Sequence, residues 1–456
     1  MPDPMTFSQH LRAVLLLGLP LVGSHLAQFA VHMVDALMLG RYDVTALAAS
    51  VLAGGYFFVL FIMGAGFSFA VMPMVAEAAE QGDEVRIRRV TRMGLWLSVI
   101  YAVAVLPVMV WSAPILRALR QTEEMSSLAQ DYLAIVGVGM APALLVMVLK
   151  SYLAALERTG VVLLITLGGV AVNAALNYLL IFGTFGAPEL GLKGAAWASV
   201  LTQTLTVVVL AVYVAKTPGT REHALFQRIW RPDPEAFAAT FKLGWPIGLT
   251  NLAESGMFSA STLIVGLLGK LALASHGIAL QITSATFMIH IGLSQAATVR
   301  AGRALGRRDW PGLAMGGRAV VALSMGTVAL TMLAFLAVPE ALMAPFLSPD
   351  EPDRAAIFAM GASLLAVAAL FQLVDAGQIM ALGLLRGIQD TTWPMYAAAI
   401  SYWGLGIPTS YVLGITFGMG AVGVWLGLVI GLAFAAVLMW WRYAQLYARL
   451  ARAEAA

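Results

Sequence analysis

The sequence predicts an all-α integral membrane protein with twelve transmembrane helices in two pseudo-symmetric six-helix lobes. Of its 456 residues, 60% are hydrophobic and only 11% are charged, whereas about a quarter of an ordinary soluble protein is charged. Twelve apolar runs are long enough to cross a bilayer, and the second half of the chain repeats the first. This composition excludes a soluble enzyme and a nucleic-acid-binding protein. The absence of Cys also excludes disulfides and thiolate metal sites.

Each predicted span is a run of mostly apolar residues, of which a transmembrane helix needs about 20. The first run is too long for a cleavable signal sequence, so we expect it to be retained as a helix. The six runs of the first half are 12–39, 46–73, 91–114, 128–154, 161–184 and 194–215. The six of the second half are 241–268, 272–299, 313–338, 355–384, 393–416 and 419–441.

The basic residues predict that both termini are cytoplasmic, because Lys and Arg are held on that side of the membrane. The two terminal segments and the even-numbered connections contain 21 of the 27 Lys and Arg residues, and the odd-numbered connections contain six. Termini on the same side require an even number of spans, and twelve satisfies this requirement.

An internal repeat relates the two halves at a shift of 226 residues. The shift superimposes Gly18 on Gly244, Pro20 on Pro246, Gly66 on Gly292, Asp83 on Asp309 and Arg92 on Arg318. Each copy has an even number of spans, so both enter the membrane from the same side, as in some secondary transporters. We therefore predict an N-terminal lobe at 1–215, a cytoplasmic interlobe linker at 216–240 and a C-terminal lobe with a short cytoplasmic tail at 241–456. A cleft between the lobes is the expected binding site.

Three acids fall inside predicted spans, namely Asp35, Glu254 and Asp375. An ionised acid in hydrocarbon costs about 2.5 to 3.5 kcal/mol on insertion scales, so such residues are functional candidates. We expect no fixed cationic partner, because Lys150 and Arg386 fall near span ends. The acids are then protonated, hydrogen-bonded to neutral groups, or neutralised by a cation that comes and goes. The third alternative describes a transporter, in which Glu254 and Asp375 bind the cation near the membrane midplane.

Neutral polar residues are predicted to complete the polar cavity. In the repeat alignment Gln28 falls opposite Glu254, and Ser261 falls opposite Asp35, so each half has an acid where the other has a neutral polar group. Asn173 and Asn177 lie one helical turn apart in the same half as Asp35. Hydrogen bonding that holds the helices together is an equally good interpretation of this pair. Gln281 in the eighth span is a further cavity candidate.

Several separated motifs then carry a family resemblance over about residues 10–445. They are Val34-Asp35-Ala-Leu-Met-Leu-Gly40, Asn177-Tyr178, Ala187-Pro188-Glu189-Leu190-Gly191, Glu254, Ala274-Ser-His276, Val299-Arg300-Ala-Gly302, Gln372-Leu-Val-Asp375 and Leu385-Arg386-Gly387. Together they resemble the multidrug and toxic compound extrusion (MATE) family, and its bacterial NorM-like branch in particular.

The resemblance implies a twelve-helix antiporter with the MATE fold that expels organic cations or drugs in exchange for Na⁺ or H⁺. It implies that Glu254 and Asp375 hold the coupling ion, Na⁺ being bound as a metal, and that Asp35 is a further coupling acid in the first lobe. The NorM-like pattern often has a Tyr one turn before the span-10 acid, where this chain has Phe371. Phe371 keeps the ring of this cavity residue and loses its hydroxyl.

The sequence also leads to expectations about cofactors, partners, location and alternative functions. The chain is expected not to be an enzyme and to need no cofactor beyond Na⁺ or H⁺. It has no Walker A motif, so ATP is not indicated, and neither is nucleic acid. Membrane lipids are expected partners of a monomer, and the resemblance implies a multi-pass protein of the bacterial inner (cytoplasmic) membrane. Two alternatives stay open: a lipid-linked precursor flippase of the same superfamily and, from another class, a polytopic membrane enzyme that acts on lipids.

Overall fold

The computed structural model describes residues 5–349 and 351–455. This part of the chain consists of helices joined by short connections, and it contains no strand. The prediction of an all-α protein is confirmed. The contacts within the chain divide it into two compact units, one made of the chain up to Val22 and from Leu249 onward, and the other of Gly23–Gly248. We call these unit 1 and unit 2.

Two long helices pass from one unit to the other. In α1 (Phe7–Tyr42) the division falls after Val22, and in α9 (Pro234–Gly266) it falls after Gly248. The 226-residue shift of the repeat superimposes these two positions. The beginning of each repeat's first helix therefore belongs to the unit that contains the rest of the other repeat. The predicted lobes at 1–215 and 241–456 follow the sequence repeat, and their boundaries stay a prediction.

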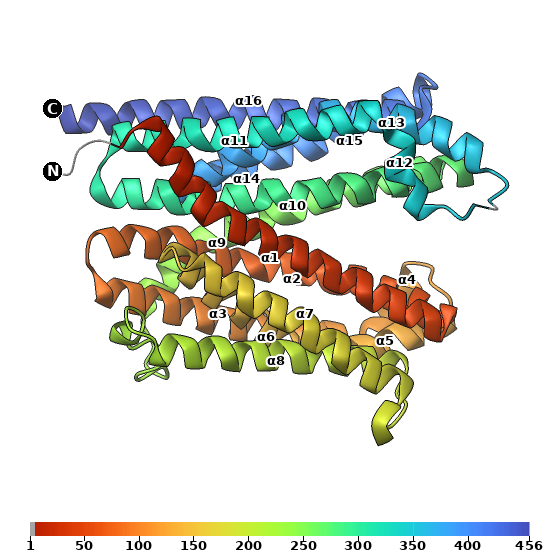
Figure 1. Cartoon of the computed structure of the whole chain (residues 1–456), viewed down its shortest axis with the longest axis horizontal. Helices are drawn as coiled ribbons and strands as arrows, with labels where there is room; N and C mark the ends of the chain where they lie inside the picture. The colour runs from red at the N-terminus through yellow and green to blue at the C-terminus, as the bar shows by residue number, and fades with distance from the viewer. Residues whose placement is uncertain (1–4, 350, 456) are drawn as a thin grey trace. The chain divides into compact units, whose positions relative to one another are not determined.

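Unit 1 is built around α13, which packs against α10, α11 and α16 (Figure 1). Besides the parts of α1 and α9, its α-helices are α10 (Lys270–Arg307), α11 (Trp310–Ala337), α12 (Pro339–Met343), α13 (Arg354–Gly387), α14 (Thr392–Ala399), α15 (Ile407–Tyr411) and α16 (Gly420–Ala455). Its other helical segments are the 3-10 turn η3 (Ala344–Phe346) and the π-helices η4 (Ile400–Gly406) and η5 (Val412–Thr416).

Unit 2 is built around α2, which packs against α3, α5 and α6. Its α-helices are α2 (Val44–Glu80), α3 (Glu84–Val110), α4 (Ser112–Ala118), α5 (Glu123–Val138), α6 (Met140–Ala155), α7 (Thr159–Phe182) and α8 (Leu192–Lys216). Two 3-10 turns, η1 (Thr184–Gly186) and η2 (Arg221–His223), follow α7 and α8.

Glycines allow the first helix of each repeat to approach its neighbour within a unit. In unit 2, a Cβ on Gly66 of α2 would lie 2.4 Å from the backbone nitrogen of Gly248 in α9. In unit 1, a Cβ on Gly292 of α10 would lie 2.6 Å from the backbone nitrogen of Val22 in α1. Gly66 and Gly292 are equivalent in the repeat, and so are Gly248 and Val22. The same backbone approach is thus made once in each unit, and any larger side chain would prevent it.

Repeat-related aspartates also have equivalent roles. The carboxylate of Asp83 accepts a hydrogen bond of 2.8 Å from the backbone N–H of Arg86, at the start of α3. The carboxylate of Asp309 accepts one of 2.8 Å from the backbone N–H of Gly312, at the start of α11. Both residues therefore cap a helix N-terminus, where the first N–H groups have no partner within the helix.

Nine helices of the described chain are long and apolar enough to cross a membrane, or ten if the bent pair α5 and α6 is one span. That pair bends by 46° at Gly139, inside the predicted span 128–154. The predicted span 393–416 is interrupted twice by π-helix. The number of twelve spans and the cytoplasmic position of the termini stay predictions.

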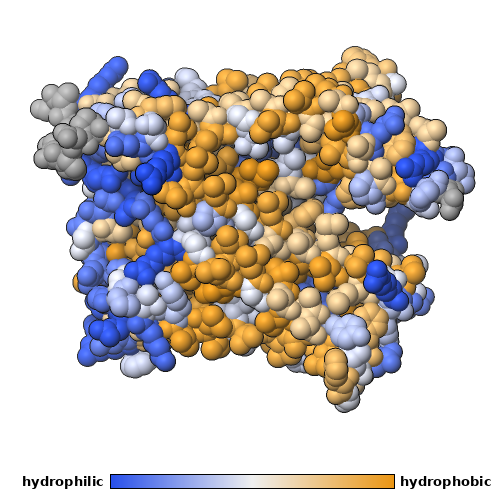
Figure 2. All heavy atoms as spheres, in the orientation of Figure 1, coloured by the Kyte–Doolittle hydropathy of each residue, from blue (hydrophilic) through white to orange (hydrophobic). Residues whose placement is uncertain are grey.

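The surface has the polarity of a membrane protein. Figure 2 shows hydrophobic residues along the middle of the helices and hydrophilic residues towards their ends, most densely at one end of each unit. In unit 2 this end contains the connection between α2 and α3, and in unit 1 it contains the connection between α10 and α11. Apolar side chains on the helices, such as Leu164, Leu263 and Leu330, are 69%, 75% and 71% exposed and suit contact with lipid.

Candidate functional site

Unit 1 contains the two acids that were predicted near the membrane midplane. Glu254 lies on α9 and Asp375 on α13, and the two carboxylates interact electrostatically. The Asp375 side chain is only 1% exposed. Both carboxylate oxygens of Asp375, and Oε1 of Glu254, are buried and accept no hydrogen bond from the described residues. Buried acceptors are normally satisfied, so these three oxygens mark a place where a cation or a proton is needed.

A cation lies close to this pair, contrary to the sequence expectation. Arg386, near the end of α13, interacts electrostatically with Glu254. Its Nη2 donates a hydrogen bond of 2.6 Å to Oδ1 of Asn251, one turn before Glu254 on α9. Arg386 is thus a cation near Glu254 that the sequence did not lead us to expect, but its hydrogen bond goes to Asn251 and not to the acid. The absence of a fixed cationic partner stays a prediction. A long Arg side chain at a helix end reaches a neighbouring helix that the linear sequence does not identify.

A third element, the π-helix η4, is fixed against α9 beside Glu254. Nε1 of Trp403 donates a hydrogen bond of 3.1 Å to the backbone oxygen of Ala253. A Cβ on Gly256 would lie 2.7 Å from the Trp403 ring, so only glycine leaves room for this contact. The neighbouring residue, Tyr402, is fully buried and interacts electrostatically with both Glu254 and Asp375. Its hydroxyl has no hydrogen-bond partner among the described residues.

Aromatic rings close the apolar side of this cluster. Phe371 is 1% exposed and lies on α13, one turn before Asp375. Its ring packs edge-on against Phe258 at 5.9 Å and against Trp425 at 5.7 Å between ring centres. Gln281 on α10 is partly buried, and no described hydrogen bond joins it to either acid. The role of Phe371 and Gln281 in a substrate cavity stays a prediction.

The buried histidine of this core is fixed by its partners. Nε1 of Trp425 donates a hydrogen bond of 3.0 Å to Nδ1 of His276. That nitrogen therefore carries no proton, and the proton of the neutral ring lies on Nε2, 3.0 Å from Oγ1 of Thr262. His276 thus joins α9, α10 and α16, which accounts for its burial without any role in proton transfer.

Unit 2 brings together Asp35, Asn173 and Asn177. The side-chain amide of Asn177 on α7 donates hydrogen bonds to Oδ1 of Asp35 on α1 and, at 3.1 Å, to Oδ1 of Asn173. Asn173 is 3% exposed and Asn177 is fully buried. Oδ1 of Asn177 is left without a partner among the described residues. Asn173 therefore orients the Asn177 amide so that its N–H₂ group faces the acid.

One further residue, Tyr132 on α5, interacts electrostatically with Asp35. The sequence contained no signal for it, because Tyr132 lies on a different helix, almost a hundred positions from Asp35. Gln28, on the same helix as Asp35, has no described hydrogen bond to it. The coupling role of Asp35 and the cavity role of Asn173, Asn177 and Gln28 stay predictions.

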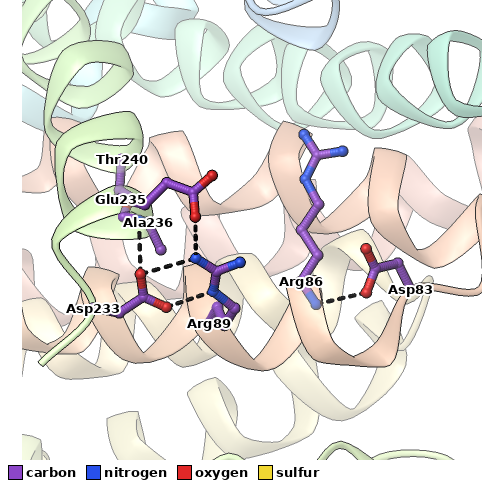
Figure 3. A network of polar contacts seen from close by, with 7 residues as sticks. All are labelled: Asp83, Arg86, Arg89, Asp233, Glu235, Ala236 and Thr240. Atoms are coloured by element: carbon purple, nitrogen blue, oxygen red, sulfur yellow. Dashed lines mark hydrogen bonds and ion pairs between the residues drawn. The ribbon is translucent and has the colours of Figure 1, made fainter. Parts of the chain in front are cut away.

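The polar segment 216–240, predicted to be the interlobe linker, is attached to α3 within unit 2. Its Asp233 accepts hydrogen bonds from Nε and Nη2 of Arg89, at 2.5 and 3.0 Å, and Glu235 accepts one of 2.5 Å from Nη2 (Figure 3). The Arg89 guanidinium beside Asp233 holds the pKa of that carboxyl below its ordinary value.

The same face of α3 holds the middle of this segment. Arg92 donates hydrogen bonds to the backbone oxygens of Leu225, at 2.9 Å, and Ala224, at 3.3 Å. Nε1 of Trp96 donates one of 2.7 Å to the backbone oxygen of Ile229. Residues 224–235 are therefore a docked strap and not a free tether, since their backbone is held at several points.

Comparison with known proteins supports a single assignment. The MatE family model matches residues 20–179 and again residues 246–412. The starts of these two matches are related by the 226-residue shift of the sequence repeat. The model therefore matches each half of the chain once, and together the two matches cover well over half of it.

Curated relatives align over almost the whole chain. The chain is 44% identical over 447 residues to the probable multidrug resistance protein NorM of Rhizobium meliloti, covering 98% of the chain and 96% of the relative. It is 42% identical over 440 residues to the protein of the same name from Agrobacterium fabrum, covering 96% and 95%. Among solved structures, the eukaryotic MATE transporter AtDTX14 matches with a TM-score of 0.86 at 17% identity, covering 97% of this chain and 98% of that one. This last similarity concerns the fold alone.

Proposed function

The chain belongs to the MatE family of multidrug and toxic compound extrusion transporters, and from this premise we propose that it exports organic cations in exchange for Na⁺. It has the MATE fold and is a multi-pass membrane protein. Because members of the family are transporters, the prediction that it is not an enzyme is confirmed. Relatives named as multidrug resistance proteins support small-molecule drugs as its substrates.

The observation that supports ion coupling is the group of unsatisfied carboxylate oxygens in unit 1. Asp375 Oδ1 and Oδ2 and Glu254 Oε1 are buried without a hydrogen-bond donor. Na⁺ is a hard cation that suits oxygen ligands, and it would supply the missing partner for both acids. A proton bound by one of the two acids brings the same single positive charge and satisfies only one of the three oxygens, so H⁺ is the second alternative.

The charges of the cluster favour a single monovalent cation. When a bound cation keeps both acids ionised beside the Arg386 guanidinium, the side chains of Glu254, Asp375 and Arg386 together have a net charge of −1. One Na⁺ or one organic cation would neutralise it. Ion and drug would then compete for the same negative charge, so that the binding of one favours release of the other.

The rest of the proposal follows from the family and the composition. Export proceeds by alternating access, without ATP, in a monomer of the bacterial inner membrane surrounded by lipid. Asp35, with Asn177 and Asn173, forms a second polar site in unit 2 and is the leading carrier if protons drive export.

The test is efflux of a preloaded fluorescent organic cation from cells that express the protein, started at constant pH by adding NaCl or KCl at equal ionic strength. We expect acceleration by Na⁺ only, and its loss in Glu254→Gln and in Asp375→Asn. The matched control is Glu340→Gln, which removes the same charge from an exposed position in α12. The control should export like the wild type.

Three outcomes contradict parts of the proposal. Full Na⁺-driven efflux in Glu254→Gln would show that this acid is not needed to bind the coupling ion. Efflux that ignores Na⁺ and collapses with a protonophore would move the coupling to H⁺. Movement of a lipid-linked precursor without movement of the organic cation would favour the flippase alternative.

A further inference from the structure

The hydroxyl of Tyr402 is buried, where a polar group normally has a hydrogen-bond partner. The side chain is fully buried, yet the hydroxyl forms no hydrogen bond within the described chain. Leaving a buried polar group unsatisfied costs about 1 to 3 kcal/mol. A phenylalanine would fill the same space without this cost, so the hydroxyl needs an explanation beyond packing.

The local backbone places this hydroxyl in the charged cluster. Tyr402 lies in the π-helix η4, and π-helices inside α-helical segments are frequent at functional sites. The next residue, Trp403, is hydrogen-bonded to the backbone oxygen of Ala253, directly before Glu254. A Cβ on Gly406, one turn later, would lie 3.7 Å from Sδ of Met257. The residue after Tyr402 therefore contacts α9 directly before Glu254, and Gly406 lies close to Met257 on the same helix.

Charged side chains surround the phenol. Tyr402 lies within electrostatic range of Glu254 on α9 and of Asp375 and Arg386 on α13. Among the described residues, no group of three His, Cys, Asp or Glu is placed to hold a metal. Any ligand beyond the two carboxylates must therefore be a neutral oxygen, and the Tyr402 hydroxyl is one without a partner.

We propose that the Tyr402 hydroxyl is a direct ligand of the Na⁺ bound by Glu254 and Asp375, and that it selects for this ion. A phenol oxygen is a hard donor of the kind that Na⁺ prefers. The assignment also explains how the site functions with Phe371 on α13, whose ring has no oxygen and packs in the apolar core. This inference rests on the proposed function, in which the two acids hold Na⁺.

The test is direct binding of radioactive Na⁺ to the purified full-length protein in detergent, above neutral pH, with Li⁺ and K⁺ as competitors. We expect Tyr402→Phe to weaken Na⁺ binding about tenfold, which corresponds to about 1.4 kcal/mol, and to reduce the preference for Na⁺ over K⁺. Thermal stability without Na⁺ should stay equal or rise, because an unsatisfied hydroxyl has been removed.

The matched control is Tyr443→Phe. The Tyr443 hydroxyl is also buried without a partner in unit 1, but its electrostatic interaction is with Tyr447 and not with the acids. The control should bind Na⁺ like the wild type. Unchanged affinity and selectivity in a folded Tyr402→Phe variant would overturn the inference.

A second measurement separates this inference from the proposed function. Na⁺ should change the ultraviolet difference spectrum of tyrosine in the wild type and in Tyr443→Phe, and not in Tyr402→Phe. A Na⁺-induced signal that persists in Tyr402→Phe overturns the role of this residue while Na⁺ coupling stands. Absence of Na⁺ binding in the wild type overturns both the ligand assignment and Na⁺ coupling, whereas drug efflux driven by protons would leave the transporter assignment intact.

Discussion

The indole of Trp403 is hydrogen-bonded to the backbone oxygen of Ala253, at 3.1 Å, one residue before the buried acid Glu254. This bond connects the interrupted helical run 392–416 to α9 at the level of the acidic cluster. The position of Tyr402 relative to Glu254 therefore depends on a contact made by its neighbour.

Replacing Trp403 by Phe is expected to disturb the ion site more than the fold. The change removes the N–H donor to Ala253, at a cost of about 1 kcal/mol in unfolding free energy, and loosens η4 beside Glu254. We expect weaker Na⁺ binding in the purified protein. Trp96→Phe removes a similar bond, to Ile229 in unit 2, and should cost similar stability while leaving Na⁺ binding unchanged. Equal Na⁺ affinity in the two variants would refute this prediction.

Gly66→Ala is expected to destabilise the protein strongly. The new Cβ would lie 2.4 Å from the backbone nitrogen of Gly248 and 2.5 Å from the backbone oxygen of Gly244, so one helix must move. Overpacking of this kind costs about 1 to 3 kcal/mol or more. Gly54→Ala on the same helix meets no atom within 4 Å and should stabilise by about 0.5 to 1 kcal/mol. Thermal melts of the two variants in detergent should move in opposite directions.

The docked strap is expected to loosen in acid because of His223, the residue directly before it in η2. The hydroxyl of Tyr152 is 2.5 Å from Nδ1 of His223, and burial lowers the pKa of this imidazole below 6.5. The docked state therefore resists protonation, whereas a released strap takes up a proton below about pH 6.5. The docking free energy therefore has its full value above about pH 6.5. It declines as the pH falls from there towards the lowered pKa of the docked imidazole.

Hydrogen exchange of residues 221–231 between pH 8 and pH 5 measures this effect. The protection of these amides, corrected for intrinsic exchange, should fall with pH in the wild type. In His223→Gln the protection should be independent of pH over the same range, although lower throughout. A pH dependence that survives this substitution would show that another group titrates.

Asn177→Ala is expected to impair coupling more than Asn173→Ala. Asn177 donates directly to Asp35, whereas Asn173 only orients the Asn177 amide at 3.1 Å. Loss of a hydrogen bond to a charged group corresponds to about a tenfold effect or more, so we expect at least this reduction in efflux driven by the coupling ion for Asn177→Ala. If the Asn173 variant is impaired more severely, the orientation argument is wrong.

The features that follow from composition and periodicity could be predicted from the sequence. Helices, the internal repeat and the three acids within apolar runs were all visible, because a charge among apolar residues stands out without knowledge of its neighbours. Helical spacing placed the amides of Asn173 and Asn177 on one face. A polar site with Asp35 was one of two equal interpretations of that pair, and hydrogen bonding between helices was the other.

Features that depend on contacts between helices were not visible. Arg386 reaches Asn251 from a helix end and lies within electrostatic range of Glu254, and Tyr402 lies within electrostatic range of both acids on a π-helix. No local pattern identifies the partner of a long side chain or the extra residue of a π-turn. The docking of 224–235 onto α3 was hidden for the same reason, since a segment rich in Arg, Asp and Pro has the composition of a free loop.

The division of the units within α1 and α9, after Val22 and Gly248, has a consequence for the origin of the chain. A single repeat on its own would lack the helical segment that its unit takes from the other repeat. Two copies of such an ancestor would have to exchange the first part of their leading helix, as a domain-swapped homodimer does. Fusion of two copies of the ancestral gene would then preserve this exchange within one chain. The beginnings of α1 and α9 would correspond to the helix segments that the two subunits of the dimer exchanged.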